Sequence, residues 1–150
     1  MDLHLQSKCL KLTLNSAWLA GFTDAEGCFN VNIVPRLASV VGFRTTLRFV
    51  LDQQFEREIL LLIASLLGTG HVSCRASTNK VYRLTVDSFK HLPSLIFYFS
   101  NFPLKSHKKI SFENWCVIYT KMLNKEHLRQ PGFDQIKSLA KLVNKHSTSL

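Results

Sequence analysis

The chain has 150 residues, 46% hydrophobic and 19% charged, which is the size and composition of one globular domain rather than a disordered tail. Basic residues outnumber acidic ones by 19 to 10, so the formal net charge is +9. This excess points to a polyanionic partner, nucleic acid ahead of an acidic membrane surface, with a merely solvated basic shell as the plain alternative. The longest apolar run, residues 59–67, falls far short of the ~20 residues of a membrane helix, so no membrane partner is expected.

The first half of the chain predicts one helix followed by two strands. Asn15 is a good N-cap, and a helix is expected from there to about residue 25. Residues 1–14 before it are interpreted as a linker or arm. Alternation of apolar and polar residues then predicts a strand at 28–36 and another at 43–52, separated by a loop.

The second half repeats the order of strands and helices. A leucine-rich helix is predicted at 54–67 and two shorter strands at 70–77 and 80–86, joined by a polar turn at 77–79. Further helices are expected at 89–99, capped by Asp87 or Ser88, at 111–123, and at 133–145 within a C-terminal helix and tail spanning 132–150. The predicted fold class is therefore α+β, with the order αββαββα and an extra helix, in a single domain of residues 1–150.

The polar alternates of the four strands are expected to share one face of the sheet, opposite the helices. That set is basic and amide-rich and contains no acidic residue. Arg can pair bidentately with guanine, Asn with adenine, and Thr or Ser with bases or phosphates. For any one residue the plain reading is an exposed strand position, but the set as a whole predicts nucleic-acid contact. Its members are Asn30, Asn32, Arg44, Thr46, Arg48, Ser73, Arg75, Arg83 and Thr85, with His71 and Arg36 nearby.

The sequence LAGFTDAEG ends the predicted first helix. Ala17, Gly21 and Asp24 lie on one helical face with Ala20 beside them, and small residues at these spacings let two helix backbones approach closely. Taken residue by residue, the alternative is a tight helix-to-strand corner at which Gly27 supplies an unusual backbone angle.

Taken whole, this stretch resembles the signature of the LAGLIDADG homing endonucleases in its variant form LAGF(T/V)DAEG. All of its positions match with accepted substitutions, and the predicted order of elements extends the resemblance over most of the chain. The resemblance implies a saddle-shaped, curved antiparallel sheet with helices on one face, lying along the DNA major groove. It also implies that two signature helices pack together across a two-fold axis, each delivering one carboxylate to the scissile phosphates.

The resemblance assigns the reacting end of the signature helix. Glu26 stands at the position of the catalytic, metal-binding carboxylate, with the Ala25 carbonyl beside it, and Asp24 matches an acidic position that is mostly structural. The expected cofactor is Mg²⁺, with Mn²⁺ or Ca²⁺ as substitutes in binding, because paired hard cations suit in-line phosphodiester hydrolysis and take oxygen ligands.

Two further catalytic positions follow from the same resemblance. Gln53 matches the polar residue at the end of the second strand, near the hydrolytic water, with Asp52 as the weaker candidate. The run PLKSHKK matches the basic segment of the site. Lys108 is the first choice there, and Lys105 and Lys109 compete with it or contact phosphates.

The function implied is a metal-dependent, site-specific double-strand DNA endonuclease, encoded by an intron. Because the chain holds one copy of the signature, the expected enzyme is a homodimer on a long palindromic or nearly palindromic site, with Ala17, Ala20, Gly21 and Asp24 at its interface. The alternative is that the chain is one half of a two-motif enzyme.

Two other functions stay open at this stage. One is an intron maturase that binds intron RNA, and the other is a DNA-binding protein of the same fold that has lost cleavage. By resemblance, the expected location is an organelle, mitochondrion or chloroplast.

Overall fold

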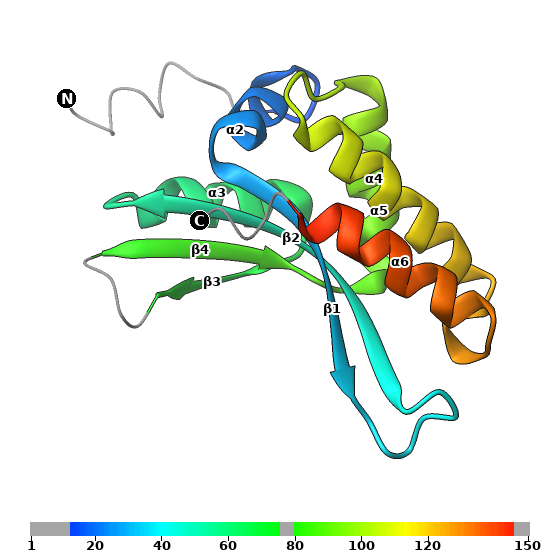
Figure 1. Ribbon diagram of the computed structural model, residues 1–150. Coiled ribbons are helices and arrows are strands. Elements are labelled where there is room, and N and C mark those ends of the chain that lie inside the picture. The colour runs from blue at the N-terminus through cyan, green and yellow to red at the C-terminus, as the bar shows by residue number, and fades with distance from the viewer. Residues whose placement is uncertain (1–12, 76–79, 146–150) are drawn as a thin grey trace.

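The computed structural model describes residues 13–75 and 80–145. One antiparallel sheet in the order β1-β2-β4-β3 is covered by helices on one face (Figure 1). This confirms the α+β class and the αββαββα order with an additional C-terminal helix. The strands are β1 (Gly27–Pro35), β2 (Phe43–Gln54), β3 (His71–Cys74) and β4 (Val81–Val86), and the helices are α2 (Trp18–Glu26), α3 (Arg57–Leu67), α4 (Leu92–Asn101), α5 (Lys108–Leu123) and α6 (Gly132–Asn144), with 3-10 turns η1 (Phe89–His91) and η2 (Glu126–Leu128).

The strand register sorts the side chains onto two faces. Phe29 pairs with Phe49, which pairs in turn with Val86, and all three are buried beneath the helices. Since neighbours across an antiparallel ladder point the same way, the intervening residues of every strand share the opposite face. The sheet therefore has one apolar face, which carries the core, and one polar face.

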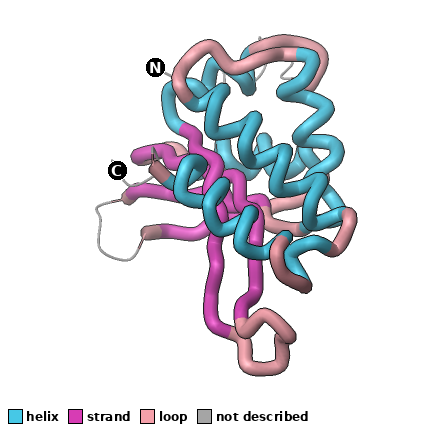
Figure 2. The backbone as a smooth tube through the Cα atoms, turned by 45° about the vertical axis from the view of Figure 1, so that its right-hand side comes forward, coloured by secondary structure: helices cyan, strands magenta, loops and turns pink. Residues whose placement is uncertain are grey.

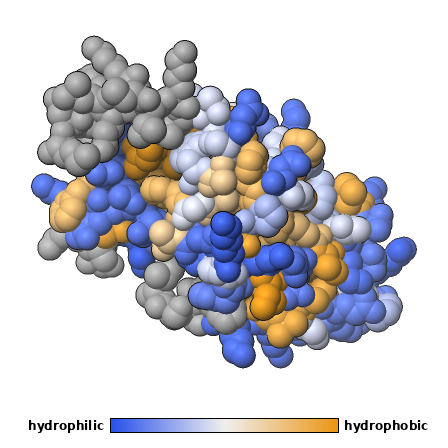
Figure 3. Space-filling view, turned by 90° about the horizontal axis from the view of Figure 1, so that it is seen from above, coloured by the Kyte–Doolittle hydropathy of each residue, from blue (hydrophilic) through white to orange (hydrophobic). Residues whose placement is uncertain are grey.

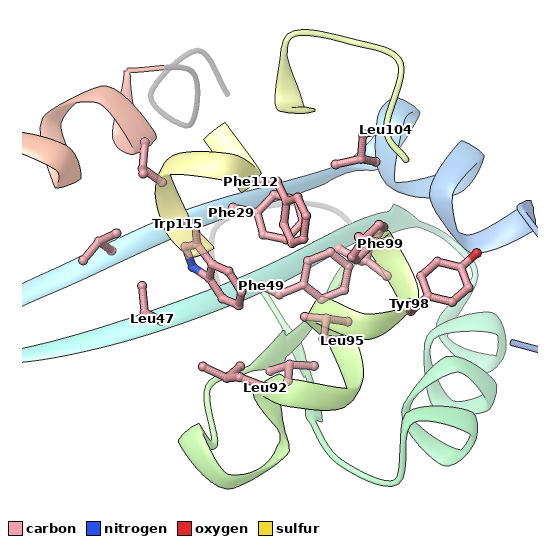
Figure 4. Close-up of a cluster of buried hydrophobic side chains, with 14 of the residues drawn as sticks. Phe29, Leu47, Phe49, Leu92, Leu95, Tyr98, Phe99, Leu104, Phe112 and Trp115 are labelled. Atoms are coloured by element: carbon pink, nitrogen blue, oxygen red, sulfur yellow. The ribbon is translucent and has the colours of Figure 1, made fainter. Parts of the chain in front are cut away.

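The core is an aromatic cluster between the sheet and helices α4 and α5. Phe29 lies at its centre, with its ring centroid 5.2 Å from that of Phe49, 5.5 Å from Phe99, 5.1 Å from Phe112 and 5.3 Å from Trp115 (Figure 4). Tilted and edge-on contacts of this kind are the favoured aromatic geometries. The cluster fixes β1, which begins directly after α2 ends, together with its neighbour β2.

Strands β1 and β2 continue as a long hairpin beyond the helical layer (Figure 2). β1 is an edge strand, whose unpaired backbone groups need a partner. Asn144 of α6 supplies one, because its side-chain amide donates to the Val31 carbonyl and accepts from the Val31 N–H, both at 2.9 Å. The C-terminal helix thus closes the edge of the hairpin at its base.

Several predicted boundaries were wrong by a few residues. α2 begins at Trp18 rather than at the predicted N-cap Asn15, and no side chain of its own segment caps it. α3 begins at Arg57 because β2 runs on to Gln54, while α5 begins at Lys108, three residues before its predicted start. Three predicted segments lie wholly or partly outside the described residues. These are the turn at 77–79, residues 1–12 of the predicted arm 1–14, and residues 146–150 of the predicted C-terminal helix and tail 132–150.

Tyr98 of α4 replaces the missing local cap of α2. Its hydroxyl accepts from the Ala20 N–H at 3.0 Å and donates to the Ser16 carbonyl at 2.8 Å, so it pairs one of the orphan donors of the helix start (Figure 4). Burial raises the pKa of this phenol, and the hydrogen bond to Ala20 opposes the rise in part. The start of α2 is therefore held from a helix far away in sequence.

Position 27 is occupied by glycine because there is no room for a side chain there, and not because the backbone angles require it. The expectation of an unusual angle was wrong, because its φ is −103°, which any residue adopts. A Cβ at this position would lie 2.8 Å from Thr23 Cγ2 and 2.9 Å from Leu51 Cδ2, both fully buried side chains. The glycine lets the end of α2 rest directly on β2.

Gly27→Ala is expected to destabilise the fold by about 1–3 kcal/mol, because neither buried neighbour can give way without disturbing the core. Denaturant unfolding measures the loss, with Gly21→Ala as the matched control, since a Cβ there meets nothing within 4 Å. Equal stability of the two variants would contradict the close approach at residue 27.

Candidate active site and nucleic-acid interface

Glu26 is the last residue of α2 and is exposed, and β1 begins at the next residue. No hydrogen bond or ion pair to its carboxylate is made by any residue in the described part of the chain. The C-terminal end of a helix carries partial negative charge, so a carboxylate there costs stability. The fold therefore gains no stability from an acid at this place.

Lys108 is the cation that the chain itself brings to this end of α2. It lies in the first turn of α5, and its Nζ donates to the carbonyls of Thr23 at 3.1 Å and Asp24 at 2.8 Å. Lys105 and Lys109 are exposed, and neither ammonium has a hydrogen bond to α2. Of the three competing lysines, Lys108 is therefore the one whose ammonium is bound at the C-terminal end of α2.

Asp24 anchors the segment that carries Lys108. Its carboxylate accepts from the Lys105 N–H at 3.0 Å, and from the Ser106 N–H at 3.1 Å and Ser106 Oγ at 2.6 Å. Burial alone would raise the pKa of this carboxyl, but the hydrogen bonds from Ser106 and Lys105 and the charge of Lys108 outweigh it and lower the pKa below its usual 3.8. Asp24 thus holds the α2 end and the start of α5 together.

The lowered pKa gives Asp24 a defined effect on stability against pH. Because the folded state favours the ionised form, this contribution is complete above about pH 3.8 and is lost as the pH falls through the lower, folded-state pKa. Asp24→Asn is expected to cost about 1–3 kcal/mol at neutral pH, and the gap should close in acid, where the native side chain is protonated too. Thermal melts from pH 7 to pH 2.5 test this. The control Asp87→Asn, at an exposed aspartate, should shift little.

The register brings Gln53 to the same region. Gly27, the first residue of β1, pairs with Leu51, and β2 then continues past the start of β1, so Gln53 follows two residues beyond that pair. It is half-buried at the strand end. The Ala25 carbonyl comes next in the chain after the two carbonyls that Lys108 binds. Ala25, Glu26 and the Lys108 ammonium therefore belong to the C-terminal end of α2, and Gln53 lies on β2 two residues beyond the partner of Gly27.

The polar face of the sheet holds the residues predicted for it. Asn30 pairs with Arg48, Asn32 with Thr46, and the face continues across β4 and β3. Its residues are Asn30, Asn32, Arg44, Thr46, Arg48, Arg83 and Thr85, then His71 and Ser73, with Arg75 directly after β3. Arg36 follows β1 in the exposed loop, and Thr85 is the least available member, at 9% exposure. We name this surface the reading face.

The expectation that the reading face holds no acid was wrong. The alternation that places Arg48 and Val50 on it continues one step further to Asp52. Asp52 forms ion pairs with Arg83 at 2.7 Å and with Arg75 at 3.4 Å, so its carboxylate is engaged with basic residues of the face. The hydrogen bond that Arg83 donates to Asp52 is also the main reason that the pKa of Arg83 is raised.

The small-residue face of α2 is only partly available to a second helix. Ala17 and Gly21 are exposed, whereas Ala20 is 4% exposed and packs within its own chain, so it has little surface left to bury against a partner. Asp24 is tied to its own chain through Ser106. Seen from above, the described surface of the molecule shows apolar and weakly polar atoms among hydrophilic ones (Figure 3). Of the residues predicted for a dimer interface, Ala17 and Gly21 are therefore the two with exposed surface.

Two classes of feature are missing from the described residues. None of the helices in residues 13–75 and 80–145 is long and apolar enough to cross a membrane. The same residues contain no group of three or more His, Cys, Asp or Glu side chains placed to hold a metal ion. At the end of α2 the described residues include two carboxylates, Asp24, which is bound by Ser106, and Glu26, which is exposed.

The described chain thus combines a sheet that has one basic face with an exposed carboxylate at the end of a helix. The chain matches the family described as LAGLIDADG endonuclease over residues 19–119 and belongs to that family. It is 32% identical over 124 residues to a probable intron-encoded endonuclease 4 of Neurospora crassa, covering 83% of this chain and 22% of that protein. It is 40% identical over 63 residues to DNA endonuclease I-CvuI of Chlorella vulgaris, covering 41% of this chain and 39% of that one.

Solved structures agree with this assignment. The homing endonuclease I-TnaI superposes with a TM-score of 0.82 at 26% identity, covering 90% of each chain. The archaeal intron-encoded homing endonuclease I-Vdi141I, solved in complex with DNA, superposes with a TM-score of 0.78 at 27% identity, covering 96% of this chain and 85% of that one. By contrast, the chain spans only 22–36% of the length of the first three curated relatives it matches.

Proposed function

We propose that this protein is a site-specific double-strand DNA endonuclease that acts as a homodimer on a long, palindromic or nearly palindromic site. The observation that carries the proposal is the Glu26 carboxylate, which has no partner among the described residues and stands at the helix end where Lys108 is bound and β1 of the basic reading face begins. The DNA complexes of I-Vdi141I and of I-LtrWI support duplex DNA as the partner. Intron encoding in an organelle is part of the proposal, supported by relatives named for a cox1 intron and an ND4 intron.

The donors at the α2 end fit a hard divalent cation. A carboxylate and a backbone carbonyl are oxygen ligands, and Mg²⁺ is commonly held by one or two carboxylates together with phosphate oxygens and water. Glu26 and the Ala25 carbonyl would hold such an ion. When bound, it supplies charge stabilisation to the phosphate and lowers the pKa of bound water.

The other residues at this end have separate tasks. The ammonium of Lys108, fixed by two carbonyls at the end of α2, provides positive charge for the phosphate, and preorganised charge of this kind costs no rearrangement during the reaction. The Gln53 amide can both donate and accept a hydrogen bond, so it orients the attacking water. The reading face binds the duplex and sets its register.

The homodimer follows from the count of carboxylates. One chain provides one Glu26, whereas cutting two strands across a two-fold axis takes two such groups. Ala17 and Gly21 leave the backbone of α2 open to a second copy of the same helix. Each chain then places its own Glu26, Lys108 and Gln53 at one of the two scissile phosphates.

Incubation of the purified chain with a randomised duplex DNA library tests the proposal. Sequencing of the ends formed in Mg²⁺, with chelator-treated samples alongside, should give one long recurrent site with two-fold symmetry. Affinity for that site should fall steeply as salt rises, because phosphate contacts release counterions. Binding without metal-dependent cuts would favour a cleavage-inactive DNA-binding protein. Tight binding to folded intron RNA with no duplex preference would favour a maturase.

A further inference from the structure

The reading face carries one carboxylate among its described strand residues, that of Asp52. Its side chain is 15% exposed. It accepts from Arg83 Nε at 2.7 Å and from Arg83 Nη2 at 2.9 Å, while Arg75 Nη1 approaches at 3.4 Å. Asp52 and Arg83 are direct partners in the β2–β4 register, so the pair is built into the sheet.

Neither affinity for a polyanion nor fold stability accounts for this acid. A carboxylate on a surface that meets phosphates lowers affinity, because the two negative charges repel. An ion pair whose arginine side chain is 31% exposed contributes little to stability. What Asp52 does supply is geometry, since it fixes the plane and direction of the Arg83 guanidinium.

The hydrogen bonds to Asp52 leave the end of the Arg83 guanidinium available to contact a base. A guanidinium has five N–H donors, and the Asp52 carboxylate occupies the side formed by Nε and Nη2. The end of the group, formed by Nη1 and the second hydrogen of Nη2, has no hydrogen-bond partner among the described residues. This end pair matches the O6 and N7 acceptors of guanine, the commonest specific contact in the major groove.

The position of the pair on the sheet selects which bases it meets. Asp52 follows Leu51, which pairs with Gly27, the residue after Glu26. The Asp52–Arg83 pair therefore lies at the α2 end of the reading face, next to the proposed cleavage site. The hairpin tip, around Arg36, lies at the far end of β1 and β2 (Figure 1).

We propose that Asp52 is a positioning residue for base recognition, which holds Arg83 so that its end pair of N–H groups reads a guanine close to the cut in each half-site. Asp52 lowers the sequence-independent affinity for DNA and raises the preference for guanine over the other bases at that position. This inference rests on the proposed function, because it needs duplex DNA on the reading face.

Selection from the randomised duplex library, done with the native chain and with Asp52→Asn, tests the inference. The native site should contain a G·C pair near each cut. In Asp52→Asn the preference for that pair should fall roughly 10- to 100-fold, while the other positions keep theirs. Affinity for unrelated duplex should stay equal or rise, because a negative charge is removed.

Two variants make the test specific. Glu113→Gln, at an exposed position of α5, removes the same charge from outside the reading face and should leave every base preference unchanged. Arg83→Lys keeps the positive charge but lacks the planar fork, so it should lose the same preference, and the double variant should lose no more than either single one.

Three outcomes separate the hypotheses. A uniform fall in affinity at all positions would give Asp52 a purely structural role and overturn the inference. An unchanged guanine preference, or no guanine at that position in the native site, would overturn it as well. Failure of the native chain to select any duplex would refute the proposed function itself, and the inference with it.

Discussion

Replacement of Glu26 by glutamine is expected to abolish DNA cleavage while leaving DNA binding intact. The variant keeps the shape of the side chain but loses the charge that would hold a divalent cation. Loss of preorganised electrostatic stabilisation costs about 10²- to 10³-fold in rate at minimum. The single-turnover cleavage rate on the selected site, measured in Mg²⁺ beside a binding titration, shows both effects.

The fold stability of this variant separates chemistry from misfolding. Because a carboxylate at the C-terminal end of α2 is unfavourable, Glu26→Gln should unfold at the same or a higher denaturant concentration, with a gain of about 0.3–1 kcal/mol. Glu113→Gln is the control for the lost charge and should cut at the native rate. Native cleavage by Glu26→Gln would contradict the assignment of the carboxylate.

Substitution of Gly21 by leucine should break the dimer and end double-strand cleavage. Gly21 is exposed in the middle of α2 and has no neighbour within 4 Å of an added Cβ, so the isolated chain gains nothing from a glycine there. Gly21→Ala should even stabilise the isolated chain by about 0.5–1 kcal/mol. The glycine is explained if a second α2 backbone packs against it, and leucine would hold the two helices apart.

Sedimentation of the variants at several protein concentrations measures this effect. Gly21→Leu should sediment as a folded monomer, with helix content unchanged by circular dichroism. Ser138→Leu places the same bulk on the exposed side of α6 and should remain dimeric. A Gly21→Leu chain that dimerises and cuts both strands would rule out α2 as the dimer contact.

The sequence predicted the reading face well because side chains in a strand alternate and one side of this sheet is buried. Asn30, Asn32, Arg48 and Arg83 all lie where the alternation placed them. Asp52 belongs to the predicted strand at 43–52, but the set of polar residues predicted for this strand ended at Arg48. Extending it through residue 52 would have placed an acid beside Arg83.

Contacts between distant segments were beyond the reach of sequence patterns. Tyr98 holds the start of α2 and Ser106 binds Asp24, over separations of 82 residues in each case. Nothing local in PLKSHKK distinguishes three lysines, and only the start of α5 at Lys108 brings that ammonium to α2. The resemblance put Lys108 first without predicting this contact, and its catalytic role stays a prediction.

The central claim is that each chain supplies one Glu26 to one DNA strand. Native and Glu26→Gln chains, differently tagged and refolded together, give mixed dimers that can be purified through both tags. On a supercoiled plasmid carrying the selected site, the mixed dimer should produce nicked circles and stop, while the native dimer produces linear DNA. Linear product from the mixed dimer at the native rate would contradict the claim.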